Sequence, residues 1–184
     1  MIGRVRINER LCALLWLWPL VVSGAALAQQ TCDSSVYPLS TPTSRFEDNN
    51  DGTITDKQSN LMWLRCSAGQ EWSGGTCIGN AKMVTWKESE KLAQALNASG
   101  SYFFEDWRVP QIRELATIAE RQCNNPRINL QLFIATPAAA YWSFTSRGDA
   151  SSESSAFALS FGPEGVRYED KESQHYLRLV RSGP

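Results

Sequence analysis

The chain has 184 residues and a formal net charge of −1 at pH 7, with charged residues making up 20% of it. This balance provides no basic surface for a nucleic acid, and we expect no nucleic-acid partner. Hydrophobic residues make up 42% of the chain, enough for one domain with its own core.

The first 28 residues have the pattern of a bacterial secretion signal. Three arginines come before an apolar run over residues 11–22, which is short for a membrane span. A small-x-small site at residues 26–28 predicts cleavage after Ala28. We therefore expect a periplasmic or secreted protein that starts at Gln29, carries a net charge of −3 and has no membrane span. An uncleaved N-terminal anchor is the alternative.

Four cysteines remain after the signal, and an even number in an exported chain indicates two disulfides. Three pairings are possible. We favour Cys66–Cys77, which closes a Gly-rich loop, and Cys32–Cys123, which would tie the N-terminal segment to the end of a helix. Zinc is the rival interpretation, but no Cys-x-x-Cys spacing is present and the single histidine, His175, is far away in the sequence.

The mature chain begins with a segment that lacks periodicity. Residues 29–44 are rich in Ser, Thr and Pro and are expected to form a flexible arm. The globular domain is expected over residues 45–184. A strong turn signal at 48–52 comes before two short strands, 53–55 and 61–64, which indicate a hairpin.

Two helices are expected after the Gly-rich loop. The first begins at Thr85, which has the capping-box spacing with Glu88, and ends near residues 97–100. The second begins at Pro110, which suits a first helical position, and ends at 123–126. Its solvent-facing side is expected to hold Arg113, Glu114, Glu120 and Arg121.

The last third of the chain has the alternation of strands. Residues 141–145, 156–161 and 176–181 each alternate, and a polar loop over 147–155 separates the first two. The predicted fold class is α+β, with two early helices, late antiparallel strands and disulfides that staple them.

Several short motifs follow one another over residues 45–181. They are residues 45–46, 51–56, 61–63, 85–86 and 180–181. The most informative are Asp106, Trp107, Arg108 and Pro110, followed by Glu114, Leu115, Tyr141 and Trp142. Together these motifs resemble the Lcl C-terminal domain family, which was named from the end of a bacterial collagen-like adhesin.

The resemblance implies a compact fold similar to C-type lectin-like and formylglycine-generating-enzyme domains. Its members are mostly exported, and the adhesin suggests attachment to glycans or host surfaces. The present chain has no collagen-like Gly-x-y repeat. Related domains often have a cysteine where Leu179 stands here, so the cysteines of this chain are expected to be used elsewhere.

Trp72 is the best candidate for a ligand-facing aromatic residue, because it lies in the Gly-rich loop where burial is less assured. Glu71 and Arg147 complete the proposed ligand-binding set, and loops 67–80 and 146–155 would carry recognition. The other candidates for sugar stacking are more simply explained as core residues. They are Trp63, Trp86, Trp107 and Trp142.

Other possible sites have simpler explanations. Residues 47–52 resemble the start of a calcium loop, but the twelfth position is Gln58, so a tight turn is favoured. A hydrolase site of His175 with Ser173 and Asp170 lacks a Gly-x-Ser-x-Gly motif. The integrin tripeptide at 147–149 is attributed to chance. Arg108 is expected to pair with Asp106 or Glu105 or to cap carbonyls, and Glu114 to form a surface ion pair.

The sequence thus predicts an exported, non-enzymatic binding module of the bacterial envelope or surface. Its partner would be an unknown glycan or envelope protein, with no cofactor and no metal. A structural partner of a pilus or secretion machine is one alternative. A divergent formylglycine-generating-type enzyme is another, disfavoured because no cysteine follows Cys123.

Overall fold

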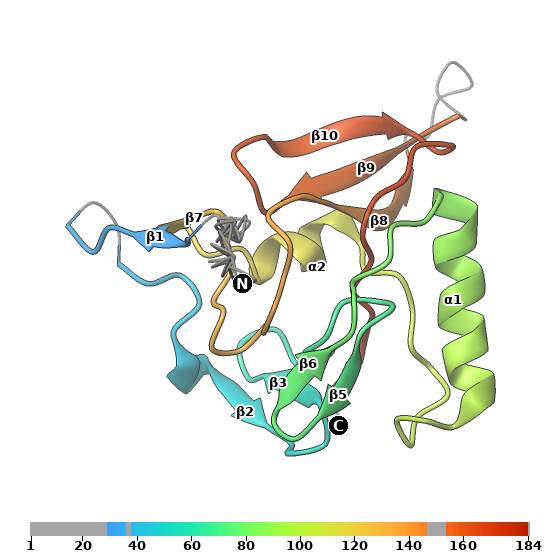
Figure 1. Cartoon of the computed structure of the whole chain (residues 1–184), viewed down its shortest axis with the longest axis horizontal. Coiled ribbons are helices and arrows are strands. Elements are labelled where there is room, and N and C mark those ends of the chain that lie inside the picture. Colours follow the sequence, from blue (N-terminus) through green and yellow to red (C-terminus); the bar gives the residue numbers. More distant parts are fainter. Residues whose placement is uncertain (1–28, 36–37, 147–153, 184) are drawn as a thin grey trace, which may run out of the picture.

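The structure is a computed structural model that describes residues 29–35, 38–146 and 154–183. It confirms the α+β fold class, with two α-helices, antiparallel sheets and two disulfides in the part described (Figure 1). The predicted signal peptide, Arg147 and the rest of the integrin tripeptide lie outside the described residues.

A four-stranded antiparallel sheet contains the predicted hairpin. Its strand order is β11 (Val180–Ser182), β4 (Leu61–Leu64), β3 (Thr53–Asp56) and β2 (Phe46–Asp48). Thr53 pairs with Leu64, and Val180 pairs with Trp63 from the other side. The end of the chain is therefore joined to its first hairpin.

A three-stranded antiparallel sheet forms the opposite side of the core. It has the order β10 (Gly165–Asp170), β9 (Ser155–Ser160) and β8 (Ala140–Ser146). Buried side chains from both sheets meet between them, including Trp63 of β4 and Tyr141 of β8. Leu115 and Ile118 add to the same cluster. The two sheets therefore share one hydrophobic core.

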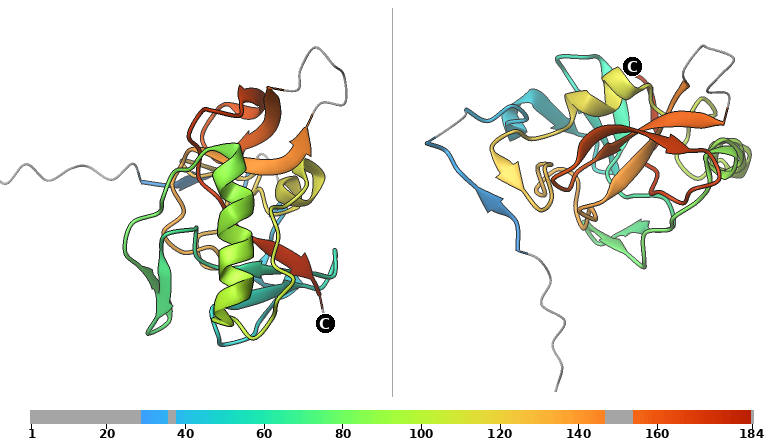
Figure 2. Two further views of the ribbon diagram at one scale, coloured as in Figure 1. Left: turned by 90° about the vertical axis from the view of Figure 1, so that its right-hand side faces the viewer. Right: turned by 90° about the horizontal axis from the view of Figure 1, so that it is seen from above.

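The helix α1 (Trp86–Ser99) runs along the outside of the domain (Figure 2). Thr85 and Glu88 form both bonds of the predicted capping box. Gly100 ends the helix with a φ of 64°, a left-handed conformation that favours glycine. Ala93 packs into a second core cluster with residues such as Trp107 and Trp142.

The second helix is shorter than predicted. Helix α2 spans Ile112–Thr117, and the prediction that it continues to residue 123 was wrong. Cys123 lies instead in a short strand, β7 (Cys123–Asn124), which pairs with β1 (Thr31–Cys32). The Cys32–Cys123 disulfide therefore joins two strands, and does not tie the N-terminal segment to the end of a helix.

Glu120 explains why α2 ends early. Its carboxylate accepts backbone N–H bonds from Ser40 and Thr41, at 3.1 and 2.7 Å, and it is 1% exposed. The prediction that Glu120 faces solvent was therefore wrong. Burial raises its pKa, but the hydrogen bonds it accepts, led by the Gln122 N–H, outweigh burial and lower the pKa to about 2.

The segment before β2 also makes specific contacts that its composition did not suggest. The Gln30 side-chain amide donates to the carbonyls of Pro126 and Ile128, at 2.6 and 2.7 Å. A short 3-10 helix, Thr43–Arg45, leads into β2. Among the described residues, no helix has both the length and the hydropathy needed to cross a bilayer.

Candidate functional site

The Gly-rich loop forms a hairpin on the surface. Strands β5 (Glu71–Ser73) and β6 (Thr76–Ile78) pair across a turn at Gly74 and Gly75, both of which have positive φ. The predicted Cys66–Cys77 disulfide is confirmed and ties β6 to the chain just after β4. Glu71, which was predicted to contact a ligand, is exposed on this hairpin.

Trp72 fixes the hairpin to the domain. It is half-buried, and a Cβ placed on Gly52 would lie 2.5 Å from its Cγ. The Arg65 guanidinium lies 4.5 Å from the centre of its ring. Trp72 can therefore offer a ligand only part of its indole, because the rest of the ring supports the hairpin.

Arg65 connects three segments beneath Trp72. Its side chain pairs with Asp48 at 2.5 Å and donates to the carbonyls of Leu132 and Gln131, both at 2.9 Å. Asp48, a member of the calcium-like motif, is thereby engaged by a cation. Sequence reasoning missed Arg65, because its partners come from distant parts of the chain.

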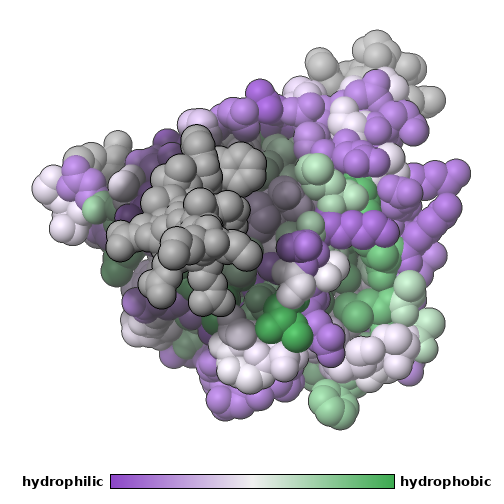
Figure 3. Space-filling model, viewed as in Figure 1, coloured by the Kyte–Doolittle hydropathy of each residue, from purple (hydrophilic) through white to green (hydrophobic). Residues whose placement is uncertain are grey.

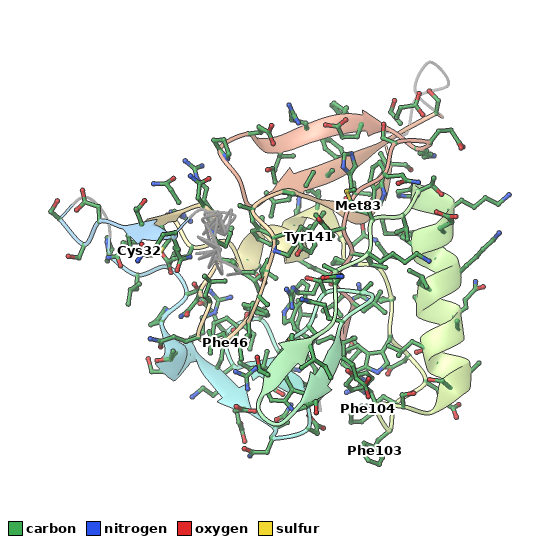
Figure 4. All side chains as sticks on the ribbon, viewed as in Figure 1. Cys32, Phe46, Met83, Phe103, Phe104 and Tyr141 are labelled. Carbon is green, nitrogen blue, oxygen red and sulfur yellow. A yellow bond between two sulfur atoms is a disulfide. The ribbon has the colours of Figure 1, made fainter. Side chains whose placement is uncertain are left out.

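The turn that follows α1 lies against the hairpin. Burial raises the pKa of the Tyr102 phenol, and the nearby Trp72 backbone lowers it by less. The next residue, Phe103, is 84% exposed and has a φ of 60°. Ile78 and Met83 are each about half exposed. We call Ile78 and Phe103, with the β5–β6 hairpin, the hairpin face. Met83 lies apart from Phe103, toward the other end of α1 (Figure 4), and separate apolar patches show on this side of the molecule (Figure 3).

The signature motif at residues 106–110 is a structural junction. The Asn97 side chain donates to the Trp107 carbonyl and accepts from the Trp107 N–H, both at 2.9 Å. Asp106 pairs with Arg181 at 2.6 Å. The motif therefore links the end of α1 to the closing strand.

Arg108 makes a different ion pair from the one predicted. Its guanidinium donates two parallel bonds, both of 2.7 Å, to the Glu114 carboxylate. The prediction of Asp106 or Glu105 as its partner was wrong, because Asp106 is taken by Arg181 and Glu114 lies on the first turn of α2. Burial raises the pKa of Glu114, but the bonds from Arg108 outweigh it and lower this pKa.

Three of the four tryptophans expected in the core are there: Trp63, Trp107 and Trp142 are fully buried. Trp86 is only partly buried: it packs against the second core cluster and stacks on Phe144 with ring centres 5.7 Å apart. Its indole N–H donates to the Ser143 carbonyl at 2.9 Å.

A groove of about 470 Å³ runs between α1 and the signature segment. Helix α1 supplies one wall, residues 107–111 supply the other, and Phe144 of β8 closes one end. We call this the α1 groove. Its lining residues are Glu90, Ala93, Gln94, Asn97, Trp107, Arg108, Val109, Gln111 and Phe144. Sequence reasoning missed Phe144, because strand alternation places it on the same face as the buried Trp142, where a core residue is expected.

Arg178 is a second residue that sequence reasoning missed. It is completely buried, and its guanidinium donates to the Leu64 and Arg65 carbonyls and to the Ser67 and Thr136 hydroxyls. The Ser67 hydroxyl lies 2.7 Å from the Tyr141 hydroxyl. This network holds the chain between β4 and β5 in place.

His175 is paired with Val84 through two backbone hydrogen bonds. Its Nε2 is 3.7 Å from Glu169, and its ring packs edge-on against Trp142. Burial lowers the pKa of His175 more than Glu169 raises it. In the part of the chain that the structure describes, no hydrogen bond joins His175 to Ser173.

A comparison with protein families shows which family contains these segments. A model described as the Lcl C-terminal domain matches residues 52–181, a span that includes the hairpin, both helices, the signature segment and most of β11. The chain belongs to the Lcl C-terminal domain family. A comparison of this Lcl C-terminal domain with curated proteins finds no match.

Proposed function

We propose that this Lcl C-terminal domain is an exported binding module of the bacterial envelope or surface that recognises glycan or protein. The observation that carries the proposal is Phe103. A large aromatic side chain that is 84% exposed, on a backbone with positive φ, is unfavourable in an isolated molecule. Non-glycine residues held at positive φ cluster at ligand-binding and active sites.

The support beneath this surface favours recognition. The hairpin is fixed by a disulfide at one point and by Trp72 at another. A fixed loop loses little conformational entropy when a ligand binds. Glu71 and the exposed part of Trp72 are proposed contacts at its edge. Arg147, outside the described residues, stays a predicted contact.

The disulfides favour an oxidising compartment, in agreement with an extracellular or periplasmic location. The signal peptide and the C-type lectin-like likeness stay predictions. A formylglycine-generating-type activity would need a free thiol. All four cysteines in the described residues are paired, so that alternative has no support here.

Retention experiments with residues 29–184 test the proposal. The oxidised protein is immobilised and exposed to a glycan array and to bacterial envelope extract. We expect a retained component whose capture falls when Ile78 and Phe103 are changed to serine. Val166→Ser is the matched control, because Val166 is as exposed as Ile78 but lies on β10. Silence in both assays would refute the proposal, as would equal capture by the variants.

A further inference from the structure

Phe144 presents a rigid aromatic surface at one end of the α1 groove. One side of its ring stacks on Trp86 at an interplanar angle of 23°, and Trp86 is itself held by Ser143. The Phe144 N–H donates to the Pro110 carbonyl at 2.7 Å, which fixes its backbone. Phe144 is nevertheless 43% exposed. The exposed part of the ring is held in place without covering any core.

Some of the polar side-chain groups on the walls of the groove have no partner among the described residues. Glu90 and Gln94 lie one turn apart on α1, and in the described residues neither makes a hydrogen bond or ion pair through its side chain. The Gln111 carbonyl oxygen accepts from the Thr145 hydroxyl, which leaves its amide nitrogen available. Planar acceptors and donors therefore face each other across the groove.

The groove has more negative charge than positive charge. Arg108 donates two hydrogen bonds to the Glu114 carboxylate, which neutralises its charge. The Glu90 carboxylate has no such partner in the described part of the chain. The groove therefore carries a net negative charge that disfavours carboxylated or sulfated ligands.

The floor of the groove is apolar. Ala93, Trp107 and Val109 are all buried and line it together. The volume lies within the range of small-molecule sites. A ligand that fits must have one apolar face, hydroxyls around its edge that both donate and accept, and no negative charge.

Resting on the proposed binding function, we infer that the α1 groove binds a neutral saccharide. A pyranose ring has an apolar C–H face that can lie on Phe144. Its neighbouring hydroxyls can donate to Glu90 and Gln94 and can accept from Gln94 and Gln111. The site lies on the side of α1 away from the β5–β6 hairpin (Figure 2, left) and is distinct from the hairpin face.

Saturation-transfer NMR and calorimetry on oxidised residues 29–184 test this inference. The probes are cellotriose, mannotriose, maltotriose and triacetylchitotriose, with a heparin tetrasaccharide as the anionic comparison. At least one neutral trisaccharide is expected to bind more tightly than the heparin fragment. Phe144→Ala and Glu90→Ala are each expected to weaken that binding about tenfold. Glu90→Ala changes only a partly exposed helix position, so it tests the site even if Phe144→Ala unfolds the domain.

Tyr168→Ala is the matched control, because Tyr168 is 47% exposed on β10 and is not part of the groove lining. It is expected to leave saccharide affinity within twofold. Tighter binding of the heparin fragment, or no binding of any neutral probe, would overturn the inference. So would affinity unchanged in both groove variants. If the proposed function fails as well, the array and the extract are also silent; if only this inference fails, capture persists and depends on Phe103.

Discussion

Gly52 lies directly against the Trp72 side chain, with room for no further atom between them. A Cβ on residue 52 would be 2.5 Å from the Trp72 Cγ, and the φ of Gly52 is 89°. The turn at 48–52 and the hairpin β5–β6 are therefore packed together through a glycine that no other residue can replace without a shift. This contact couples the candidate recognition loop to the central sheet.

Gly52→Ala is expected to displace the hairpin and to lower the free energy of unfolding by about 2–5 kcal/mol. The loss combines strain at positive φ with overpacking against the indole. Chemical denaturation followed by tryptophan fluorescence measures it. Gly75→Ala is the control, since Gly75 has a φ of 82° but nothing within 4 Å of the added Cβ. Equal losses in the two variants would show that Trp72 does not press on Gly52.

Glu120 makes stability depend on pH. Its folded-state pKa of about 2 lies below its usual value of 4.5, so the unfolded chain binds its proton first as pH falls. The stabilisation is complete above about pH 4.5 and is lost as pH falls through 2. Glu120→Gln is expected to cost about 3 kcal/mol near neutral pH. The gap between the two proteins should narrow below pH 4.5.

Urea unfolding of both proteins between pH 2 and 7 checks this expectation. Glu105→Gln is the control, because Glu105 is an exposed residue outside these networks. A gap between wild type and Glu120→Gln that stays constant over the whole pH range would contradict the role assigned to the Glu120 carboxylate.

The sequence was sufficient to predict structural features that join residues close to each other in the chain. The capping box of Thr85, the 53–64 hairpin and the Cys66–Cys77 loop all join residues within about a dozen positions of each other. The burial of Glu120 and the early end of α2 were not predicted, because the partners of Glu120, Ser40 and Thr41, lie about 80 residues away in the sequence. Their hydrogen bonds override the helical pattern. The second disulfide was found despite its length because only three pairings exist.

The two candidate surfaces were predicted to different extents. The Gly-rich sequence of this segment predicted a loop that bends back on itself, and the structure forms a β-hairpin there. It did not indicate that Trp72 supports that loop, since this depends on Gly52 and Arg65. The α1 groove was not found because its walls come from two segments that only tertiary packing brings together.

Arg178 is expected to be one of the residues most sensitive to substitution. Arg178→Met would leave at least the Leu64 carbonyl and the Thr136 hydroxyl without their donor in a buried site. Each such loss costs about 1–3 kcal/mol, so we expect about 3 kcal/mol or more in total. Arg167→Met, at a half-exposed ion pair, is expected to cost at most about 1 kcal/mol. Stability is measured by thermal and chemical unfolding. If Arg178→Met and Arg167→Met lose the same stability, the structural role of Arg178 is contradicted.

The two disulfides are expected to contribute unequally to stability. Cys32–Cys123 closes 91 residues and Cys66–Cys77 closes 11. A disulfide that closes a longer loop restricts the unfolded chain more. Replacing Cys32 and Cys123 by serine should therefore lower the free energy of unfolding by about 5 kcal/mol, and replacing Cys66 and Cys77 by about 3 kcal/mol. Urea unfolding of the two double variants measures both losses. The shorter loop nevertheless carries Trp72 and the hairpin, so loss of Cys66–Cys77 should have the larger effect on capture by the hairpin face. The opposite order in stability would mean that the N-terminal segment stays docked through Gln30 and Glu120 without its disulfide.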